Sequence, residues 1–268
     1  MQKFLTILLG LVVTLFFLGC DEQLQIQGST HIYINEVQPY KASLLTETSD
    51  GLSDFKWKVK SKNKDYTLTN SDSAEITFNA QSVGSYTLQV KAKKGHKPLK
   101  AEIHIEVTEP EVINGYTLPS EPDKTLNDST LLGIDVNNNG VRDDVERWIY
   151  QTYKDKHPIY IDIALQESKA NKKILETPEK ALEIHDEVNK ATDCQAYYKY
   201  SAKYYNEPIL IQEDAVDEHF RNKIYFNTEE RKNMYSQYEK LLSGGVYSLA
   251  KDEEQKAACD FNTSKYEE

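Results

Sequence analysis

Oxygen-bearing side chains recur at fixed intervals in the run Asp-Val-Asn-Asn-Asn-Gly-Val-Arg-Asp-Asp-Val-Glu, residues 135–146. A hard divalent cation such as calcium takes about six to eight oxygen ligands, and alternate residues of a tightly curling loop turn their oxygens inward. A glycine at the sixth position permits the sharp turn. The spacing therefore predicts a calcium site made by Asp135, Asn137, Asn139, Val141 through its carbonyl, Asp143 and Glu146.

The run satisfies the pattern D-x-[DN]-x-[DN]-G-x5-E and resembles the calcium loop of EF-hand proteins and the related loops of dockerins and thrombospondin type 3 repeats. Asp143 is expected to act directly or through water, and Glu146 through both carboxylate oxygens. The loop occurs once and no helix is expected before it, which favours a fixed structural calcium over an opening switch. Two asparagine ligands suggest a weak affinity, with a Kd of about 10⁻⁴–10⁻³ M. The alternative is an ion-free, asparagine-rich turn that caps the next helix.

A helical period follows the loop and predicts an all-α bundle over residues 143–262. The first helix is expected from Asp143, and its acidic first turn complements the helix dipole. The longest is expected to start with Thr177 as its N-cap and Pro178 in its first turn, and to end before Pro208. Two more are expected, from Asn227 to Gly244 and over residues 248–259. His185 is expected in a polar patch on the longest helix.

Residues 29–109 instead alternate with the period of two that half-buried strands require. Short strands spaced by turn signals are typical of an immunoglobulin-like antiparallel sandwich. The runs 54–59 and 84–90 resemble the polycystic-kidney-disease (PKD) repeat and related bacterial Ig-like domains. The predicted fold is therefore α+β in two domains, an Ig-like sandwich followed by a helical bundle. The expected strands are Thr30–Asn35, Tyr40–Thr46, Asp54–Lys60, Tyr66–Thr69, Ala74–Phe78, Ser85–Ala92 and Lys100–Val107.

Five lysines are expected to share one strand face, opposite Phe55, Trp57 and Val59: Lys56, Lys58, Lys60, Lys62 and Lys64. A solvated outer face that discourages edge pairing explains them. The alternative is a docking surface for an anionic polymer or lipid headgroups. Between the halves, the prolines of residues 110–134 predict an extended linker rather than a helix.

The N-terminus predicts export. Residues 1–19 combine Lys3 with an apolar stretch of about fifteen residues, too short to span a bilayer comfortably. Gly19-Cys20 resembles the lipobox of bacterial lipoproteins, which implies acylation of Cys20 and a tether over residues 20–28. The alternative is an ordinary secreted signal. The expected location is the periplasmic or cell-surface face of a bacterial membrane, inner or outer.

The other two cysteines, Cys194 and Cys259, make an even pair once Cys20 is acylated. An exported protein meets an oxidising environment, which permits a disulfide between them. Two buried free thiols are the alternative.

Charge and motif content restrict the function. The net charge is −11, with residues 111–268 carrying 31 acidic against 20 basic side chains, which argues against nucleic acid as a partner. No HExxH, GxSxG or phosphate-binding glycine loop occurs. The expected function is a non-enzymatic, calcium-binding envelope lipoprotein whose helical half binds an envelope protein or a glycan. The alternative is a cell-envelope hydrolase with dispersed carboxylates in the helical half.

Overall fold

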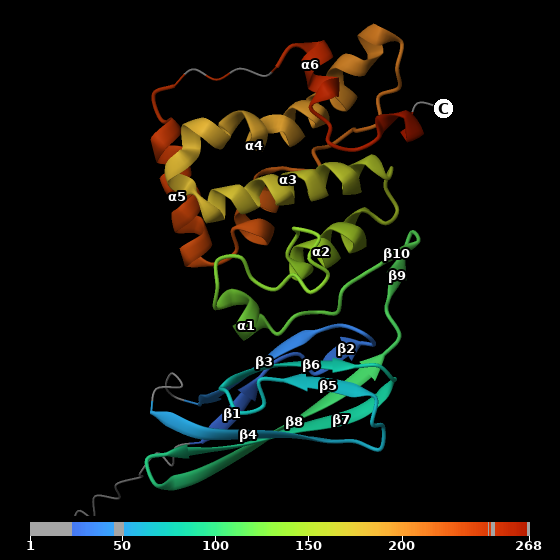
Figure 1. The fold of residues 1–268 in the computed structure, drawn as a ribbon. Helices are drawn as coiled ribbons and strands as arrows, with labels where there is room; N and C mark the ends of the chain where they lie inside the picture. The colour runs from blue at the N-terminus through green and yellow to red at the C-terminus, as the bar shows by residue number, and fades with distance from the viewer. Residues whose placement is uncertain (1–22, 46–50, 246, 248–249, 267–268) are drawn as a thin grey trace, which may run out of the picture.

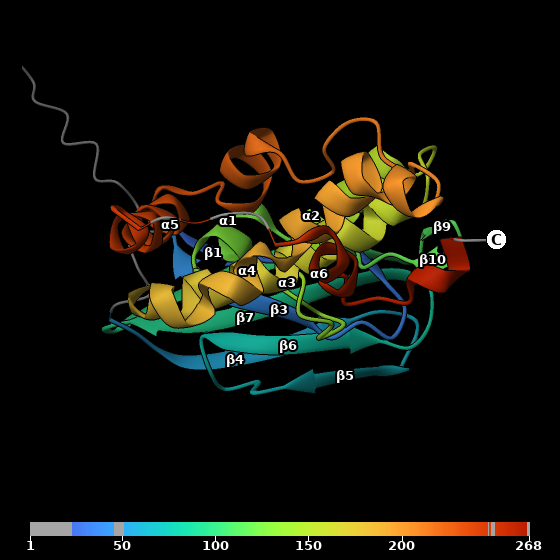
Figure 2. The same cartoon turned by 90° about the horizontal axis from the view of Figure 1, so that it is seen from above.

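The computed structural model describes residues 23–45, 51–245, 247 and 250–266 of the 268. Strands make up the first half of the chain and helices the second, so the fold is α+β. Figure 1 shows the strands below and the helices above them, and Figure 2 gives the view from the helical side. The predicted signal sequence, Cys20 and the start of the tether lie outside the described residues. Within the described part, no helix is both long and apolar enough for a membrane span.

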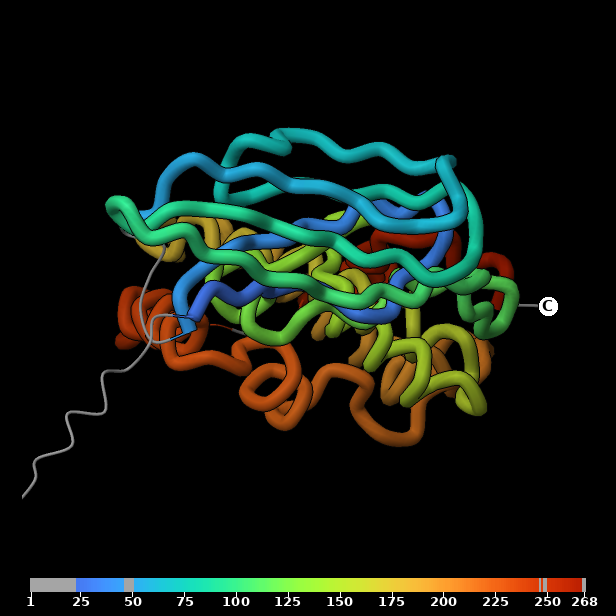
Figure 3. Tube along the Cα trace, turned by 90° about the horizontal axis from the view of Figure 1, so that it is seen from below, coloured from blue at the N-terminus to red at the C-terminus, as the bar shows by residue number. Residues whose placement is uncertain are grey.

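Two four-stranded sheets form the β half, in the orders β1-β3-β6-β5 and β2-β8-β7-β4. Seen from below in Figure 3, their strands run side by side along the molecule. The strands are β1 (Leu24–Gln27), β2 (His31–Tyr33), β3 (Gln38–Leu44), β4 (Leu52–Lys60), β5 (Tyr66–Thr69), β6 (Glu75–Ala80), β7 (Gly84–Lys94) and β8 (Lys97–Thr108).

The seven expected strands are present, and β5 has the predicted bounds. Two expectations were wrong. Strand β1 lies in the segment expected to be a tether, because Leu24 and Ile26 turn toward the sandwich core and the strand pairs with β3. Strand β2 pairs with β8 in parallel, so the sandwich is not antiparallel throughout.

The core of the β half comes from alternate residues of both sheets. Tyr40 and Phe78 of one sheet meet Tyr86 of the other, with the Phe78 and Tyr86 ring centroids 5.5 Å apart. Such edge-to-face pairs add to the free energy gained from apolar burial. Trp57 is buried and its indole N–H donates to the Ser73 carbonyl, whereas its neighbours Phe55 and Val59 are only half-buried.

The expected row of five lysines is shorter than predicted. Lys56, Lys58 and Lys60 are exposed on the outer face of β4, but the strand ends at Lys60. Lys62 and Lys64 therefore follow the strand instead of sharing its face.

The linker is more structured than an extended chain. Strands β9 (Val112–Ile113) and β10 (Tyr116–Thr117) form a small antiparallel hairpin, and α1 (Lys124–Asp128) is a short helix. Proline restricts the residue before it rather than those after it, so Pro122 leaves the following residues free to turn helical. The side chain of Asp123 caps α1 by accepting the backbone N–H of Leu126.

The helical half packs around its own core, built from the apolar faces of its helices. The α-helices are α2 (Asp143–Tyr153), α3 (Ile159–Glu176), α4 (Ala181–Ala196), α5 (Glu229–Leu242) and α6 (Asp252–Ala257). Short 3-10 turns are η1 (Pro178–Lys180), η3 (Ala202–Tyr205) and η5 (Thr263–Tyr266), and π-helical turns are η2 (Tyr197–Ser201) and η4 (Phe220–Tyr225).

The expected N-cap of the longest helix does not form. The Thr177 hydroxyl donates to the Lys173 carbonyl and so closes α3, while Pro178 opens the 3-10 turn that leads into α4. The helical path of α4, η2 and η3 then ends at Tyr205, before Pro208 as predicted. At α5 the Thr228 side chain accepts the N–H of Arg231 as a regular cap.

Helix α2 joins the two halves through one arginine. Arg147 is ion-paired with Glu111 at 2.8 Å and with Glu121 at 3.0 Å, both in the segment between the halves. It also donates to the Pro119 carbonyl and, at 3.4 Å, to the hydroxyl of Tyr33 in β2. The orientation of α2 is therefore tied to the β half.

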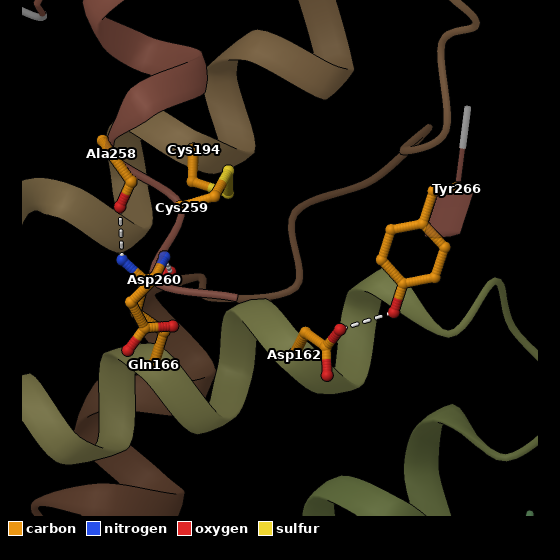
Figure 4. The surroundings of a disulfide bond; sticks show 7 residues. All are labelled: Asp162, Gln166, Cys194, Ala258, Cys259, Asp260 and Tyr266. Atoms are coloured by element: carbon orange, nitrogen blue, oxygen red, sulfur yellow. Dashed lines mark hydrogen bonds between the residues drawn. A yellow bond between two sulfur atoms is a disulfide. The ribbon is translucent and has the colours of Figure 1, made fainter. Parts of the chain in front are cut away.

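A disulfide links Cys194 at the end of α4 to Cys259 just after α6. Figure 4 shows it beside Gln166 of α3, whose side chain donates to the Ala258 carbonyl and accepts the N–H of Asp260. The C-terminal segment is thus held to α3 and α4. The predicted pairing is confirmed.

Replacing both cysteines (Cys194→Ala with Cys259→Ala) should lower the free energy of unfolding of the helical half. The bridge spans 65 residues, and the entropy of a closed loop of that length is worth about 4 kcal/mol. Urea unfolding followed by circular dichroism at the helix band measures the loss. Reduction of the unaltered protein should reproduce it, and the double variant should not respond to the reductant. An unaltered protein that is equally stable in reductant would contradict the prediction.

Candidate functional site

The segment predicted to bind calcium is a tightly curled loop leading into α2. Its side chains hold it in shape by accepting backbone N–H groups: Asp135 accepts from Asn139 and Gly140, and Asn137 accepts from Asn139. Asn139 in turn accepts from Val141 at 2.8 Å. The side-chain oxygens of loop positions one, three and five are therefore engaged within the loop itself.

Two residues of the loop need the left-handed backbone region. Asn138 has a φ of 54° and Gly140 a φ of 88°, and these residue types tolerate positive φ. An added side-chain carbon at Gly140 would meet nothing closer than 3.7 Å, so the backbone angle rather than space requires glycine there. The sharp turn expected at this position is present.

The loop ends on two fully buried carboxylates in the first turn of α2. Asp143 and Glu146 each have 0 % of their surface exposed. Asp143 accepts the backbone N–H of Val136 and so closes the loop, while its own N–H donates to the Ile134 carbonyl. Among the described residues, neither carboxylate forms an ion pair with a lysine or an arginine.

Neutral donors gather around Glu146. The Tyr116 hydroxyl donates to its Oε1 at 2.6 Å, and the Asn137 amide donates to its Oε2 at 3.1 Å. The Asn139 amide also donates to Oε1. Three side chains from two segments thus converge on one carboxylate.

Burial without a cationic partner raises the pKa of both acids. The pKa of Asp143 rises to about 8, chiefly because burial penalises the charged carboxylate, and the charges of Glu146 and Asp135 act in the same direction. The pKa of Glu146 is also raised by burial, against the effect of its hydrogen-bond donors. A positive charge placed here would lower both pKa values.

The atoms that could ligate a metal here fit calcium better than they fit a softer metal. The available groups are carboxylates, amide oxygens and a backbone carbonyl, with no sulfur or imidazole. An amide oxygen has two lone pairs and a carboxylate about four, so the backbone bonds described above leave acceptor capacity for a cation. Asp143 differs from expectation, because it is fully buried and bonded to Val136. No group of three or more histidine, cysteine or acidic side chains close enough to share a metal occurs among the described residues, so such a site depends on the two asparagines and a carbonyl.

Tyr116 is a site residue that the sequence did not reveal. It comes from the β10 hairpin, and its ring stacks on Tyr150 of α2 with centroids 4.3 Å apart. Burial and the bond to Glu146 raise the pKa of Tyr116 to about 12, so it stays protonated and acts as a donor. The linker was expected only to be extended, and nothing in its spacing marks a tyrosine that returns to the loop.

Arg142, at the eighth loop position, turns away from the loop. Its buried guanidinium pairs with Asp144 and donates to the carbonyls of Ile224 and Tyr225 at 3.1 Å. This arginine therefore connects the loop to η4.

A second polar feature lies on the outer face of β4, β7 and β8. Lys56, Lys91 and Lys100 are direct cross-strand neighbours, which places like charges opposite one another. They border a hollow of about 520 Å³. Lys100 pairs with Glu102, but Lys56 and Lys91 have no ion pair within the described residues.

No model of a known protein family matches this chain, and no curated protein matches it. Solved structures similar to the β half include the PKD domain of the KIAA 1837 protein, at 15 % identity and a TM-score of 0.27 over 35 % of this chain and 92 % of that one. The PKD domain of human KIAA0319 has 15 % identity and a TM-score of 0.27 over 37 % and 89 %. Domains 4 and 5 of the S-layer protein SbsC have 19 % identity and a TM-score of 0.21 over 33 % and 54 %. At these TM-scores the likeness carries no function to this chain, and the β half is defined by its own two sheets.

Removing the Tyr116 hydroxyl (Tyr116→Phe) should lower the free energy of unfolding of the metal-free protein by about 1.5–3 kcal/mol. It deletes a hydrogen bond to a charged group and leaves Glu146 short of a donor. The stacked partner offers a matched control, since the Tyr150 hydroxyl has no hydrogen bond among the described residues, and Tyr150→Phe should cost far less. Chemical denaturation in a chelator measures both. Equal losses from the two variants would contradict the assigned role of Tyr116.

Proposed function

We propose that this protein is a calcium-binding lipoprotein of the bacterial envelope, and that it acts as a binding or structural module rather than an enzyme. Calcium held by the loop 135–146 would stiffen the junction between a sandwich domain and a helical domain. The observation that carries this proposal is the pair of buried carboxylates at the start of α2, Asp143 and Glu146, beside a loop whose other oxygens are already gathered.

The division of labour among the loop residues follows from their contacts. Asp135, Asn137 and Asn139 would supply side-chain oxygens, and Val141 its carbonyl. Glu146 would lose the hydrogen bonds from the two asparagine amides and would bind the cation through its carboxylate instead. Asp143 would stay on Val136 and act on the ion through its charge.

Calcium bound here would act on the whole junction because α2 leaves the loop directly. One side of α2 buries Val145 and Ile149 in the helical core, and the other carries Arg147 to the segment between the halves. Fixing the first turn of α2 therefore fixes both sets of contacts. The effect is local stiffening, without an opening motion.

The membrane address comes from the sequence alone, and the start of the β half limits how far the sandwich could lie from an acylated Cys20. Strand β1 begins at Leu24, four residues after Cys20, so the extended chain between them reaches at most about 14 Å. An acylated Cys20 would therefore hold the sandwich next to the membrane. The cross-strand lysines Lys56, Lys91 and Lys100 suit such a position, because basic side chains are attracted to anionic headgroups.

Calcium should stabilise the helical half by about 1–3 kcal/mol at 10 mM, for a Kd of about 10⁻⁴–10⁻³ M. Thermal unfolding with calcium and with chelator measures the shift, and isothermal calorimetry measures binding directly. Asp135→Ala should abolish both. Asn138→Gly is the matched control, since residue 138 is not an expected ligand and its φ of 54° suits glycine.

Two results would reject the calcium proposal. One is an absence of binding heat at millimolar calcium in the unaltered protein. The other is a melting temperature that calcium raises equally in the unaltered protein and in Asp135→Ala, which would place the ion elsewhere.

Cys20→Ser should abolish both acylation and cleavage before residue 20 when the full chain is produced in a bacterium. Incorporation of labelled palmitate and the intact mass of the product are the measurements. Cys194→Ser should keep the label, because that thiol belongs to the disulfide. A Cys20→Ser product that is cleaved normally, together with an unlabelled unaltered protein, would identify an ordinary secreted signal instead.

A further inference from the structure

The helical half contains a polar cavity that the calcium loop does not use. It has a volume of about 250 Å³ and is bordered by α3, α4, η4 and α5. Charged groups are expensive to bury unless they are paired, so a charged group in its wall needs an explanation. The residues that border it include Glu167, Arg221, His185, Asn189 and Tyr238.

Glu167 of α3 leaves one acceptor unused. Its side chain is only 2 % exposed, and Oε1 accepts from Arg221 of η4 at 2.8 Å. Its other oxygen, Oε2, is buried and has no hydrogen-bond partner. A second N–H group of Arg221 donates to the Thr192 hydroxyl at 3.1 Å. A residue that borders the cavity therefore has a carboxylate oxygen without a donor.

Tyr238 of α5 leaves one donor unused. The Asn189 amide nitrogen can only donate, so at 2.8 Å it fixes Nε2 of His185 as an acceptor and puts the ring proton on Nδ1. That Nδ1–H then donates to the Tyr238 hydroxyl at 2.9 Å. The hydroxyl proton of Tyr238 has no acceptor among the described residues. The chain from Asn189 through His185 thus ends in a free donor.

An unused acceptor and an unused donor in the wall of one cavity select the class of ligand. An ammonium group can only donate and would leave the Tyr238 proton unmatched. An ionised carboxylate can only accept and would be repelled by the carboxylate of Glu167. A hydroxyl group both donates and accepts, so a molecule with several hydroxyls satisfies both sites and adds no net charge to the ion pair of Glu167 and Arg221.

We propose that this cavity binds a neutral polyhydroxylated molecule about the size of one sugar ring. The volume lies just below the range of pockets for drug-sized ligands, which suits a small ligand. A second hollow of about 380 Å³ shares Thr192 and Arg221 with the first. Its bordering segment η4 is π-helical, a distortion often found at functional sites. This proposal rests on the helical half being a binding module and needs no calcium at the loop.

Saturation-transfer NMR on the chain from Asp21 onward, which retains every described strand and helix, tests the proposal. The probes are glucose, galactose and N-acetylglucosamine, with methylammonium and acetate as the donor-only and acceptor-only comparisons, each at about 10 mM. At least one sugar should receive saturation, and methylammonium and acetate should not. Transfer to methylammonium or acetate without transfer to a sugar would overturn the ligand class, and transfer to no probe would overturn the site.

Variants locate the binding. Tyr238→Phe removes the free donor and keeps the ring, so sugar binding should fall at least tenfold, whereas Tyr150→Phe outside the cavity should bind as the unaltered protein does. If Tyr238→Phe does not fold, Asn189→Ala on the half-buried face of α4 serves instead and should weaken binding several-fold. Undiminished binding in the cavity variant that folds would refute the site. Calcium titration of the same samples distinguishes failure of this proposal from failure of the calcium proposal. Sugar binding depends on residues of the cavity, whereas calcium binding depends on residues of the loop 135–146.

Discussion

The first turn of α2 buries two carboxylates, and neither is ion-paired with a lysine or an arginine in the part of the chain that the structure describes. Burying charge is costly, and proteins usually pair such groups or bind a metal with them. Here Glu146 is surrounded by a tyrosine hydroxyl and two asparagine amides, while Asp143 closes the loop through Val136. Neutral donors offset only part of the cost of burying a charged carboxylate. The uncompensated part of that cost raises the pKa values of both acids. A divalent cation is the partner that would complete this arrangement.

Helix α2 contacts several other parts of the molecule. Its apolar side enters the helical core, Arg147 reaches the segment next to the β half, and Arg142 at its N-terminus holds the carbonyls of η4. Tyr116 returns from the linker hairpin to the loop and stacks on Tyr150. Helix α2 therefore contacts the helical core, the linker and η4. The disulfide performs a similar role at the far side of the helical half, where it fixes the C-terminal segment to α4.

Local patterns predicted what local physics determines. Period-two alternation located the strands, and the loop pattern located the turn at Gly140. What escaped prediction depends on contacts between distant residues. Tyr116 reaches Glu146 across 30 positions, and the cavity is built by four helical segments whose relative placement no periodicity encodes. Strand β1 was mistaken for a tether because four residues give too short an alternation to recognise, and its place depends on pairing with β3.

A crystal structure of the protein grown in millimolar calcium would show directly whether the loop binds an ion. We expect an ion bound by oxygens of Asp135, Asn137, Asn139 and Glu146 and by the Val141 carbonyl, with the asparagine amide nitrogens released from the Glu146 carboxylate. A loop without an ion, in which those nitrogens still donate to Glu146, would contradict this expectation and would mean that neutral groups alone hold the buried acids.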